Sequence, residues 1–218
     1  MALTLIACQP QQAQLQPQAK VASGFQKVSN EETITSEYLI SANGIGKAKL
    51  GMTLGQLKKI VDRNTEFNLV STFVNDRNAI AVSKQGLIQY YILFDADSNE
   101  AKLNPTDNSL IVSLVTNNYN YQTEQGVKVG MPIKEAENIC GNAILFHNLN
   151  GTGEYIAFKN YDLDTIRFRA SSLKSLSNGL GFSGIYTQYP SVAYTTDKYN
   201  KGAAIAAIEI SCNKDACQ

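Results

Sequence analysis

Residues 49–61 read KLGMTLGQLKKIV, and residues 128–140 read KVGMPIKEAENIC. The two stretches align without gaps, and in each a short extended segment leads to a Gly-Met pair and then to an amphipathic helix. Thr53 can cap the first helix and Pro132 can occupy the first position of the second, because both residue types favour helix starts. Gly141 is a suitable stop for the second helix. The repeat therefore predicts two copies of one structural unit.

Each predicted helix has one apolar face. The spacing i, i+3, i+6, i+7 is typical of a buried helical face, and it holds Leu54, Leu57, Ile60 and Val61 in the first copy and Ile133, Ala136, Ile139 and Cys140 in the second. We therefore expect Leu57 and Ala136 at equivalent buried positions.

After each helix the apolar pattern changes to a period of two, which indicates β-strands. Four strands are predicted after each helix, at 67–74, 79–83, 87–94 and 109–116, and at 143–149, 155–159, 165–170 and 203–212. Residues 87–94 are apolar on both faces, which favours a central strand, whereas Arg167 and Arg169 alternate with apolar residues and predict one solvated face. The predicted fold class is α+β, with two pseudo-repeated modules, each a helix packed on an antiparallel sheet, over residues 25–120 and 121–218.

The first residues of the chain suggest an export and anchoring signal. Leu5-Ile6-Ala7-Cys8 looks like the lipobox at which bacteria cleave a lipoprotein precursor and acylate the new N-terminal cysteine. Only seven residues precede Cys8 and none is charged, so either the true start lies upstream or the match is accidental. Residues 9–24 favour the first alternative, because a stretch rich in Gln, Ala and Pro is typical of a flexible tether. We expect residues 1–8 to be a signal-peptide remnant and Cys8 to carry acyl chains such as palmitate.

The two helix-opening elements also carry a family resemblance. Gly-Met-Thr-Leu-Gly-Gln-Leu at 51–57 and Gly-Met-Pro-Ile-Lys-Glu-Ala at 130–136 resemble small bacterial envelope modules of the outer-membrane assembly lipoprotein (SmpA/OmlA) type and of the β-lactamase-inhibitor-protein type. Residues 123–130, with the helix end at Cys140-Gly141, are similar to the RpoE-regulated lipoprotein family, whose function is uncharacterised. The resemblance implies tandem modules in a bacterial envelope protein, anchored in the outer membrane and facing the periplasm or the cell surface.

Composition and motifs argue against several function classes. With 19 basic and 19 acidic residues, the chain has no field that would attract nucleic acid. His147 is the only histidine, so no multi-histidine metal site exists, and we interpret it as an ordinary strand residue rather than a catalytic base. Asp95, Asp97 and Asn99 alternate as in a calcium loop, but an acidic hairpin tip explains them equally well. No metal, no cofactor and no catalytic residue is predicted.

The cysteines other than Cys8 are expected in an oxidising compartment. Cys140 lies on the apolar helical face and Cys212 shares strand parity with Ile208 and Ile210, so both side chains can point into the same core. A Cys140–Cys212 disulfide is therefore predicted, and the local pair Cys212–Cys217 is the alternative.

One aromatic stretch could bind a partner. The residues that we single out for binding lie between Gly179 and Lys201, and they are Phe182, Tyr186, Tyr189, Tyr194 and Tyr199. Tyrosines in loops supply amphipathic contact area for a protein or a glycan, although the rings could instead pack back on the sheet. No nucleophile, base and orienting residue occur together, so the protein is predicted not to be an enzyme.

The predicted function is that of a non-catalytic bacterial envelope lipoprotein that binds or scaffolds another envelope component. The alternative is a proteinaceous inhibitor of a secreted or periplasmic hydrolase, which the layout of two helix-and-sheet modules suggests.

Overall fold

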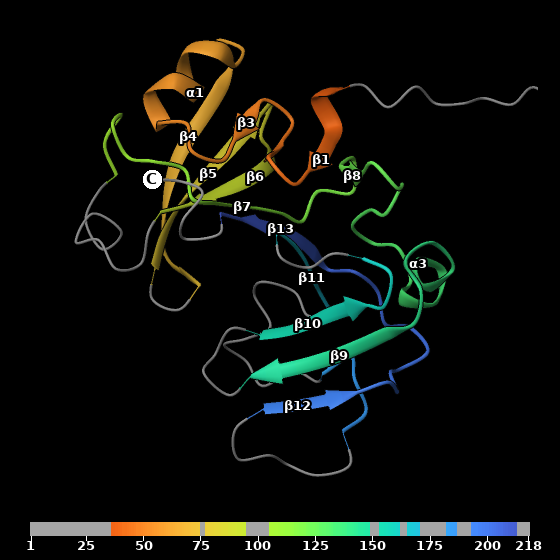
Figure 1. The fold of residues 1–218 in the computed structure, drawn as a ribbon. Coiled ribbons are helices and arrows are strands. Elements are labelled where there is room, and N and C mark those ends of the chain that lie inside the picture. The colour runs from red at the N-terminus through yellow and green to blue at the C-terminus, as the bar shows by residue number, and fades with distance from the viewer. Residues whose placement is uncertain are drawn as a thin grey trace, which may run out of the picture. The chain divides into compact units, whose positions relative to one another are not determined.

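The computed structural model describes residues 36–74, 77–94, 105–148, 153–161, 165–170, 182–186 and 193–212. All of them belong to one compact unit, Ile34–Gln218, in which strands far outnumber helices (Figure 1). No helix within these ranges is long and apolar enough to cross a lipid bilayer. The predicted signal-peptide remnant at 1–8 and the tether at 9–24 lie outside the described residues.

A small sheet follows the short 3₁₀ helix η1 (Ser36–Tyr38) with which the described chain begins. Its strands lie in the order β3-β2-β1-β8, with the bounds β1 Leu39–Ser41, β2 Gly44–Ile45, β3 Ala48–Lys49 and β8 Gln122–Thr123. The pair β1 and β8 is parallel, and Ile40 lies opposite Thr123. Sequence analysis missed these four strands, because segments of two or three residues are too short to show a period.

A larger sheet contains nine strands in the order β12-β9-β10-β11-β13-β7-β6-β5-β4, and all of its neighbouring strands are antiparallel. Their bounds are β4 Thr65–Val74, β5 Arg77–Lys84, β6 Leu87–Leu93, β7 Ser113–Thr116, β9 Ala143–Asn148, β10 Gly153–Phe158, β11 Ile166–Arg169, β12 Ala193–Thr196 and β13 Ala207–Ser211. Each of the eight predicted stretches overlaps one of these strands, and β6 has a neighbour on both sides as predicted. The ninth strand, β12, was not predicted.

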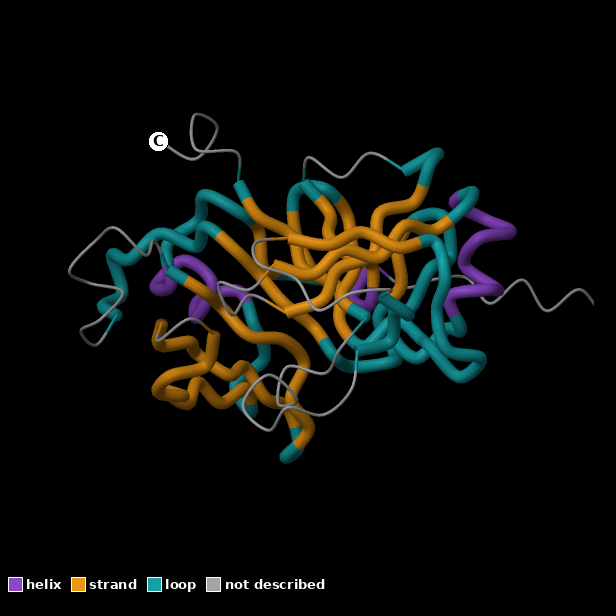
Figure 2. Tube along the Cα trace, turned by 90° about the horizontal axis from the view of Figure 1, so that it is seen from below, coloured by secondary structure: helices purple, strands orange, loops and turns teal. Residues whose placement is uncertain are grey.

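The predicted fold class, α+β with two helix-on-sheet modules, is wrong. Because β7 pairs with β13, with Leu114 opposite Ile210, strands from the two predicted modules form one continuous sheet. The α-helices described are short, 7 residues in α1 (Leu54–Ile60) and 8 in α3 (Ile133–Cys140), and they lie beside the strands (Figure 2). The described chain is therefore mainly β-structure, and one hydrophobic core contains buried residues of both halves.

The two Gly-Met turns nevertheless have the same backbone hydrogen bonds. Gly51 N–H donates to Ile111 O at 2.8 Å, and the equivalent Gly130 N–H donates to Ile205 O at 2.7 Å. In return, Ile111 N–H donates to Met52 O and Ile205 N–H donates to the equivalent methionine O, both at 2.9 Å. Both glycines have a positive φ, 80° and 83°, which side chains rarely adopt. The sequence repeat thus corresponds to a repeated turn.

The helix ends and helix burial agree with the sequence in most respects. Thr53 caps α1 through a capping box with Gln56, and Gly141 ends α3. Pro132 stands at the N-cap of α3, one position earlier than predicted. The prediction that Leu57 and Ala136 are buried is confirmed, whereas the predicted burial of the i+6 residues, Ile60 and Ile139, is wrong. In α3 the buried residues are Ile133, Ala136 and Cys140, the i, i+3 and i+7 positions, and the i+6 residue lies to one side of this face.

The predicted solvated face of 165–170 is wrong at one position. Arg167 is exposed, but Arg169 is buried between the flanking strands β10 and β13. Its Nε donates to Glu209 Oε2 at 2.9 Å, and its guanidinium lies 4.6 Å from the centre of the Tyr155 ring. A buried charge is tolerated only when it is paired and hydrogen-bonded, and Glu209 supplies that pair.

Candidate functional site

A cluster of rings lies at one end of the large sheet. His147 on β9 is the register partner of Glu154 on β10 and of Tyr194 on β12, so the three side chains leave the same face of the sheet. Phe182 and Tyr186 belong to the described segment 182–186, and the Phe182 ring centre lies 4.2 Å from that of His147 and 5.7 Å from that of Tyr186. We call His147, Phe182, Tyr186 and Tyr194 the aromatic cluster.

Glu154 holds the segment 182–186 against the sheet. Its carboxylate is fully buried and accepts the N–H groups of Ser183 and Gly184 and the hydroxyl of Tyr186, each at 2.8 Å. Ser183 Oγ also donates to Ala170 O at 2.9 Å. Burial of a carboxylate is costly, but several charge-assisted hydrogen bonds offset that cost. The rings around Glu154 are therefore held in fixed positions.

Glu154 constrains two residues of the segment, the hydroxyl of Tyr186 and the position of Gly184. Burial, the hydrogen bond to Glu154 and the charge of Glu154 together raise the pKa of Tyr186, so its hydroxyl stays protonated and remains a donor. A Cβ added at Gly184 would lie 2.8 Å from Thr196 Cγ2 and 2.9 Å from Glu154 Oε1. Only glycine fits between the carboxylate and β12.

A second set of backbone hydrogen bonds ties the segment to the residues that follow β12. Ile185 N–H donates to Lys198 O and Asn200 N–H donates to Ser183 O, both at 2.8 Å. Asn200 Nδ2 also donates to Phe182 O at 3.1 Å. The segment 182–186 is thus fixed on two sides, by Glu154 and by residues 198–200.

The cluster is partly open to solvent. Phe182 is 39% exposed, while the other three members are partly buried. Nδ1 of His147 is buried and has no hydrogen-bond partner among the residues that the structure describes. Fixed rings with an open side can stack on a planar or apolar group of a partner. In the same residues, no group of three or more His, Cys, Asp or Glu side chains is placed to hold a metal ion.

The structure brings together three of the five residues predicted to bind, Phe182, Tyr186 and Tyr194. The backbone of Tyr199 pairs with Gly184, but its side chain does not join the cluster, because the ring packs against the main core and the hydroxyl bonds to Glu137. Burial and that bond raise the pKa of Tyr199 to about 12. Tyr189 and the acidic stretch 95–100 lie outside the described residues.

Sequence analysis missed Glu154 and assigned no role to His147. A signal for Glu154 was available, since it shares strand parity with the apolar Ile156 and Phe158 and so points to the buried face.

The predicted disulfide Cys140–Cys212 is not formed. Cys140 carries a free, buried thiol, and burial raises its pKa. Cys212 is therefore not the partner of Cys140, and Cys8 and Cys217 lie outside the described residues. The alternative pair Cys212–Cys217 stays a prediction.

The fold and cluster define a mainly β protein with a fixed, partly exposed set of rings at one end of a nine-stranded sheet. No protein-family model and no curated protein matches the chain. Among solved structures, it is similar to the crystal structure of the uncharacterized protein yfeY from Escherichia coli, with a TM-score of 0.46 and 15% identity. That match covers 79% of this chain and 99% of the other.

Proposed function

We propose that this chain is a non-catalytic bacterial envelope lipoprotein that binds another envelope component, a protein or a glycan, through the aromatic cluster. The binding part of the proposal depends on Glu154, whose buried carboxylate accepts hydrogen bonds from Ser183, Gly184 and Tyr186. These bonds position the segment that includes Phe182. Rings that are fixed before binding lose little conformational entropy when a partner arrives. Aromatic side chains also dominate the binding energy of most protein interfaces.

The anchoring part of the proposal depends on Leu5-Ile6-Ala7-Cys8 and on the Gln-rich residues after it. A diacylated cysteine with an acylated amine would attach the protein stably to a membrane, because each buried methylene contributes about 0.8 kcal/mol. Wild-type protein expressed behind an export signal should sediment with membranes, and Cys8→Ser should not. Two soluble, unacylated variants would contradict the anchor.

Partner capture tests the binding surface. Phe182→Ala removes the most exposed ring but leaves the backbone groups that bond to Glu154, so the variant should stay folded. We expect its capture of the envelope partner from detergent-solubilised membranes, or its retention on purified cell-wall glycan, to fall at least about tenfold, the effect of losing one dominant contact.

Tyr119→Ala is the matched control, because Tyr119 is a more exposed aromatic residue outside the cluster. Its capture should equal that of the wild type. A folded Phe182→Ala variant with undiminished capture would remove the aromatic cluster as the binding surface. The hydrolase-inhibitor alternative depended on the two-module layout, and since that layout is wrong, no described feature favours it.

A further inference from the structure

The strand β4 forms one edge of the large sheet, and among the described residues its only strand neighbour is β5. It is ten residues long, whereas β12 at the other edge has four. Backbone groups alternate in direction along a strand, so every second residue of β4 points its N–H and C=O away from β5. An edge of this length is a template on which another strand can pair.

Side chains of β4 are exposed on both faces of the sheet. Glu66 and Asn68 are exposed on one face, and Leu69 is 44% exposed on the other. Phe67 shares the face of Leu69 and is only partly buried against the core. The regular pairing with β5 covers residues 65–70. This stretch is therefore a regular strand that pairs with no described residue on its outer side.

The edge lacks the features that usually prevent strand pairing. Natural proteins protect exposed edges with lysine, proline or inward-pointing charges. Residues 65–74 contain no lysine, arginine or proline, and Glu66 is their only charged residue. Lys58 of α1 lies over the Phe67 ring, 5.8 Å from its centre, but its Nζ is paired with Asp107 Oδ1 at 2.7 Å.

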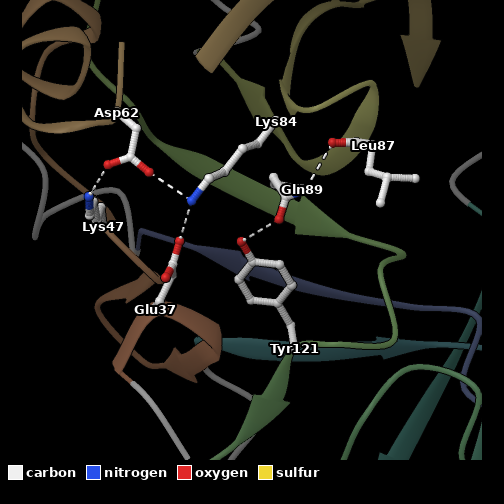
Figure 3. A network of polar contacts seen from close by, with 7 residues as sticks. All are labelled: Glu37, Lys47, Asp62, Lys84, Leu87, Gln89 and Tyr121. Carbon is white, nitrogen blue, oxygen red and sulfur yellow. Dashed lines mark hydrogen bonds and ion pairs between the residues drawn. The ribbon is translucent and has the colours of Figure 1, made fainter. Parts of the chain in front are cut away.

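Lys84, the register partner of Thr65, is also paired within the chain. Its Nζ lies 2.7 Å from Asp62 Oδ2 and 2.9 Å from Glu37 Oε1. Figure 3 shows this amino group between the two carboxylates, with Lys47 bound to the other oxygen of Asp62. Two cations thus face two anions, and the start of β4 presents balanced charges to an approaching strand.

We propose that β4 pairs with β4 of a second copy of this chain, antiparallel and about a twofold axis at Asn68. A twofold axis perpendicular to the sheet keeps the faces of both copies aligned and makes the interface isologous. Centred on Asn68, the pairing stays within the regular stretch and sets Phe67 opposite Leu69 of the second copy. Each exposed Leu69 is then covered by an aromatic ring. Glu66 faces Val70 of the second copy rather than another carboxylate.

The chemistry of the edge selects this occupant. An extended strand satisfies a row of backbone N–H and C=O groups, and β4 is complementary to itself because the pairing joins apolar residues on one face and opposes no like charges on the other. The aromatic cluster includes Tyr194 of β12, at the opposite end of the sheet order. The paired dimer therefore presents two aromatic clusters on one continuous sheet. This inference is independent of the lipoprotein anchor and of binding by the aromatic cluster.

Sedimentation velocity of the full-length chain tests the pairing, with Cys8→Ser present so that no acyl chain contributes to association. We expect a monomer–dimer equilibrium that shifts with protein concentration. Asn68→Asp places two carboxylates opposite each other at the axis, and like charges directly opposite destabilise a strand pair. The dissociation constant of the dimer should rise about fivefold. Because Asn68 is exposed, this variant should stay folded, which thermal unfolding verifies.

Asn120→Asp is the matched control, because Asn120 is also an exposed asparagine and lies in the loop between β7 and β8. Its dissociation constant should equal that of the unsubstituted edge. Mixing Asn68→Asp with Asn68→Lys should restore the dimer, since opposite charges then meet at the axis. A chain that stays monomeric, equal weakening by the two aspartate substitutions, or no restoration in the mixture would overturn the proposal.

Hydrogen exchange at residues 65–70 separates self-pairing from pairing with another protein. Protection that increases with the concentration of the chain itself supports the dimer. Protection that appears only when detergent-solubilised envelope is added overturns self-pairing and assigns the edge to a strand of another protein.

Discussion

Among single residues, Glu154 determines where the neighbouring rings lie, because its buried carboxylate accepts hydrogen bonds from Ser183, Gly184 and Tyr186. Removing this acceptor would leave three buried or partly buried donors without their partner, which costs free energy. Its contribution to stability is therefore coupled to the geometry of the aromatic cluster.

Glu154→Gln tests this coupling. The amide keeps the volume of the side chain but turns one acceptor into a donor that faces other donors. We expect the free energy of unfolding to fall by about 1.5–3 kcal/mol, the range for a lost hydrogen bond to a charged group. Denaturant titration measures the loss, and hydrogen exchange should accelerate at the Ser183 and Gly184 amides. Glu66→Gln on the exposed side of β4 is the control and should change neither quantity. Unchanged exchange at Ser183 and Gly184 would contradict the role of Glu154.

The sequence shows which residues are aromatic but not which acid holds them. Phe182, Tyr186 and Tyr194 were predicted as binding residues because tyrosine-rich loops have a recognisable composition. Their assembly depends on Glu154, which comes from a strand 28 residues before Phe182, and no local pattern links the two. Arg169 and Glu209 show the same limit, because a buried ion pair between strands is invisible until the strands are paired.

At the scale of elements, the Gly-Met turns were the most predictable part of the fold. Caps, positive φ and the first apolar positions are set by neighbours within a few residues, so Thr53, Leu57 and Gly141 behave as the sequence indicates. The hydrogen bonds that complete each turn come from Ile111 and Ile205, which are distant in sequence. A local signal thus identified the start of each turn but not its pairing partner.

Gly130→Ala measures how much the positive φ at this turn affects the free energy of unfolding. A Cβ at Gly130 would meet nothing within 4 Å, so the only penalty is the positive φ of 83°. We expect a destabilisation of about 1–2 kcal/mol in denaturant unfolding. Gly202→Ala is the control, because that position is equally open and has no positive φ; it should be neutral or stabilising by about 0.4–1 kcal/mol. Equal effects of the two substitutions would show that the turn is not strained.

For the molecule as a whole, the eight predicted strands were located correctly and their assembly was not. Period-two patterns mark a strand and its buried face, but they do not encode which strand lies next to it. The repeat made two separate sheets the natural expectation. The pairing of β7 with β13 instead joins the halves, and this pairing depends on contacts between residues nearly 100 positions apart.

Alkaline pH should destabilise the whole molecule. Burial raises the pKa of Tyr90 and Tyr121 above the usual 10.0, and the pKa of Tyr199 reaches about 12. Between pH 10 and 12 the unfolded chain therefore loses tyrosine protons that the folded chain retains, so the free energy of unfolding falls as pH rises. Denaturant midpoints at pH 8, 10 and 11 (roughly spanning the usual tyrosine pKa) check this.

Tyr90→Phe should flatten the pH dependence, because it removes a buried group that titrates. A wild-type midpoint that stays constant up to the highest of these pH values would show that the tyrosines titrate alike in the folded and unfolded states.

The position of β13 sets the order in which the sheet is completed. β13 is the last strand along the described chain, yet it lies fifth of nine in the large sheet, between β11 and β7. Until residues 207–211 leave the ribosome, the other strands form two half-sheets with open edges. A large sheet that lacks its fifth strand exposes two edges at once, so the two half-sheets can join into one cooperative structure only after β13 is in place.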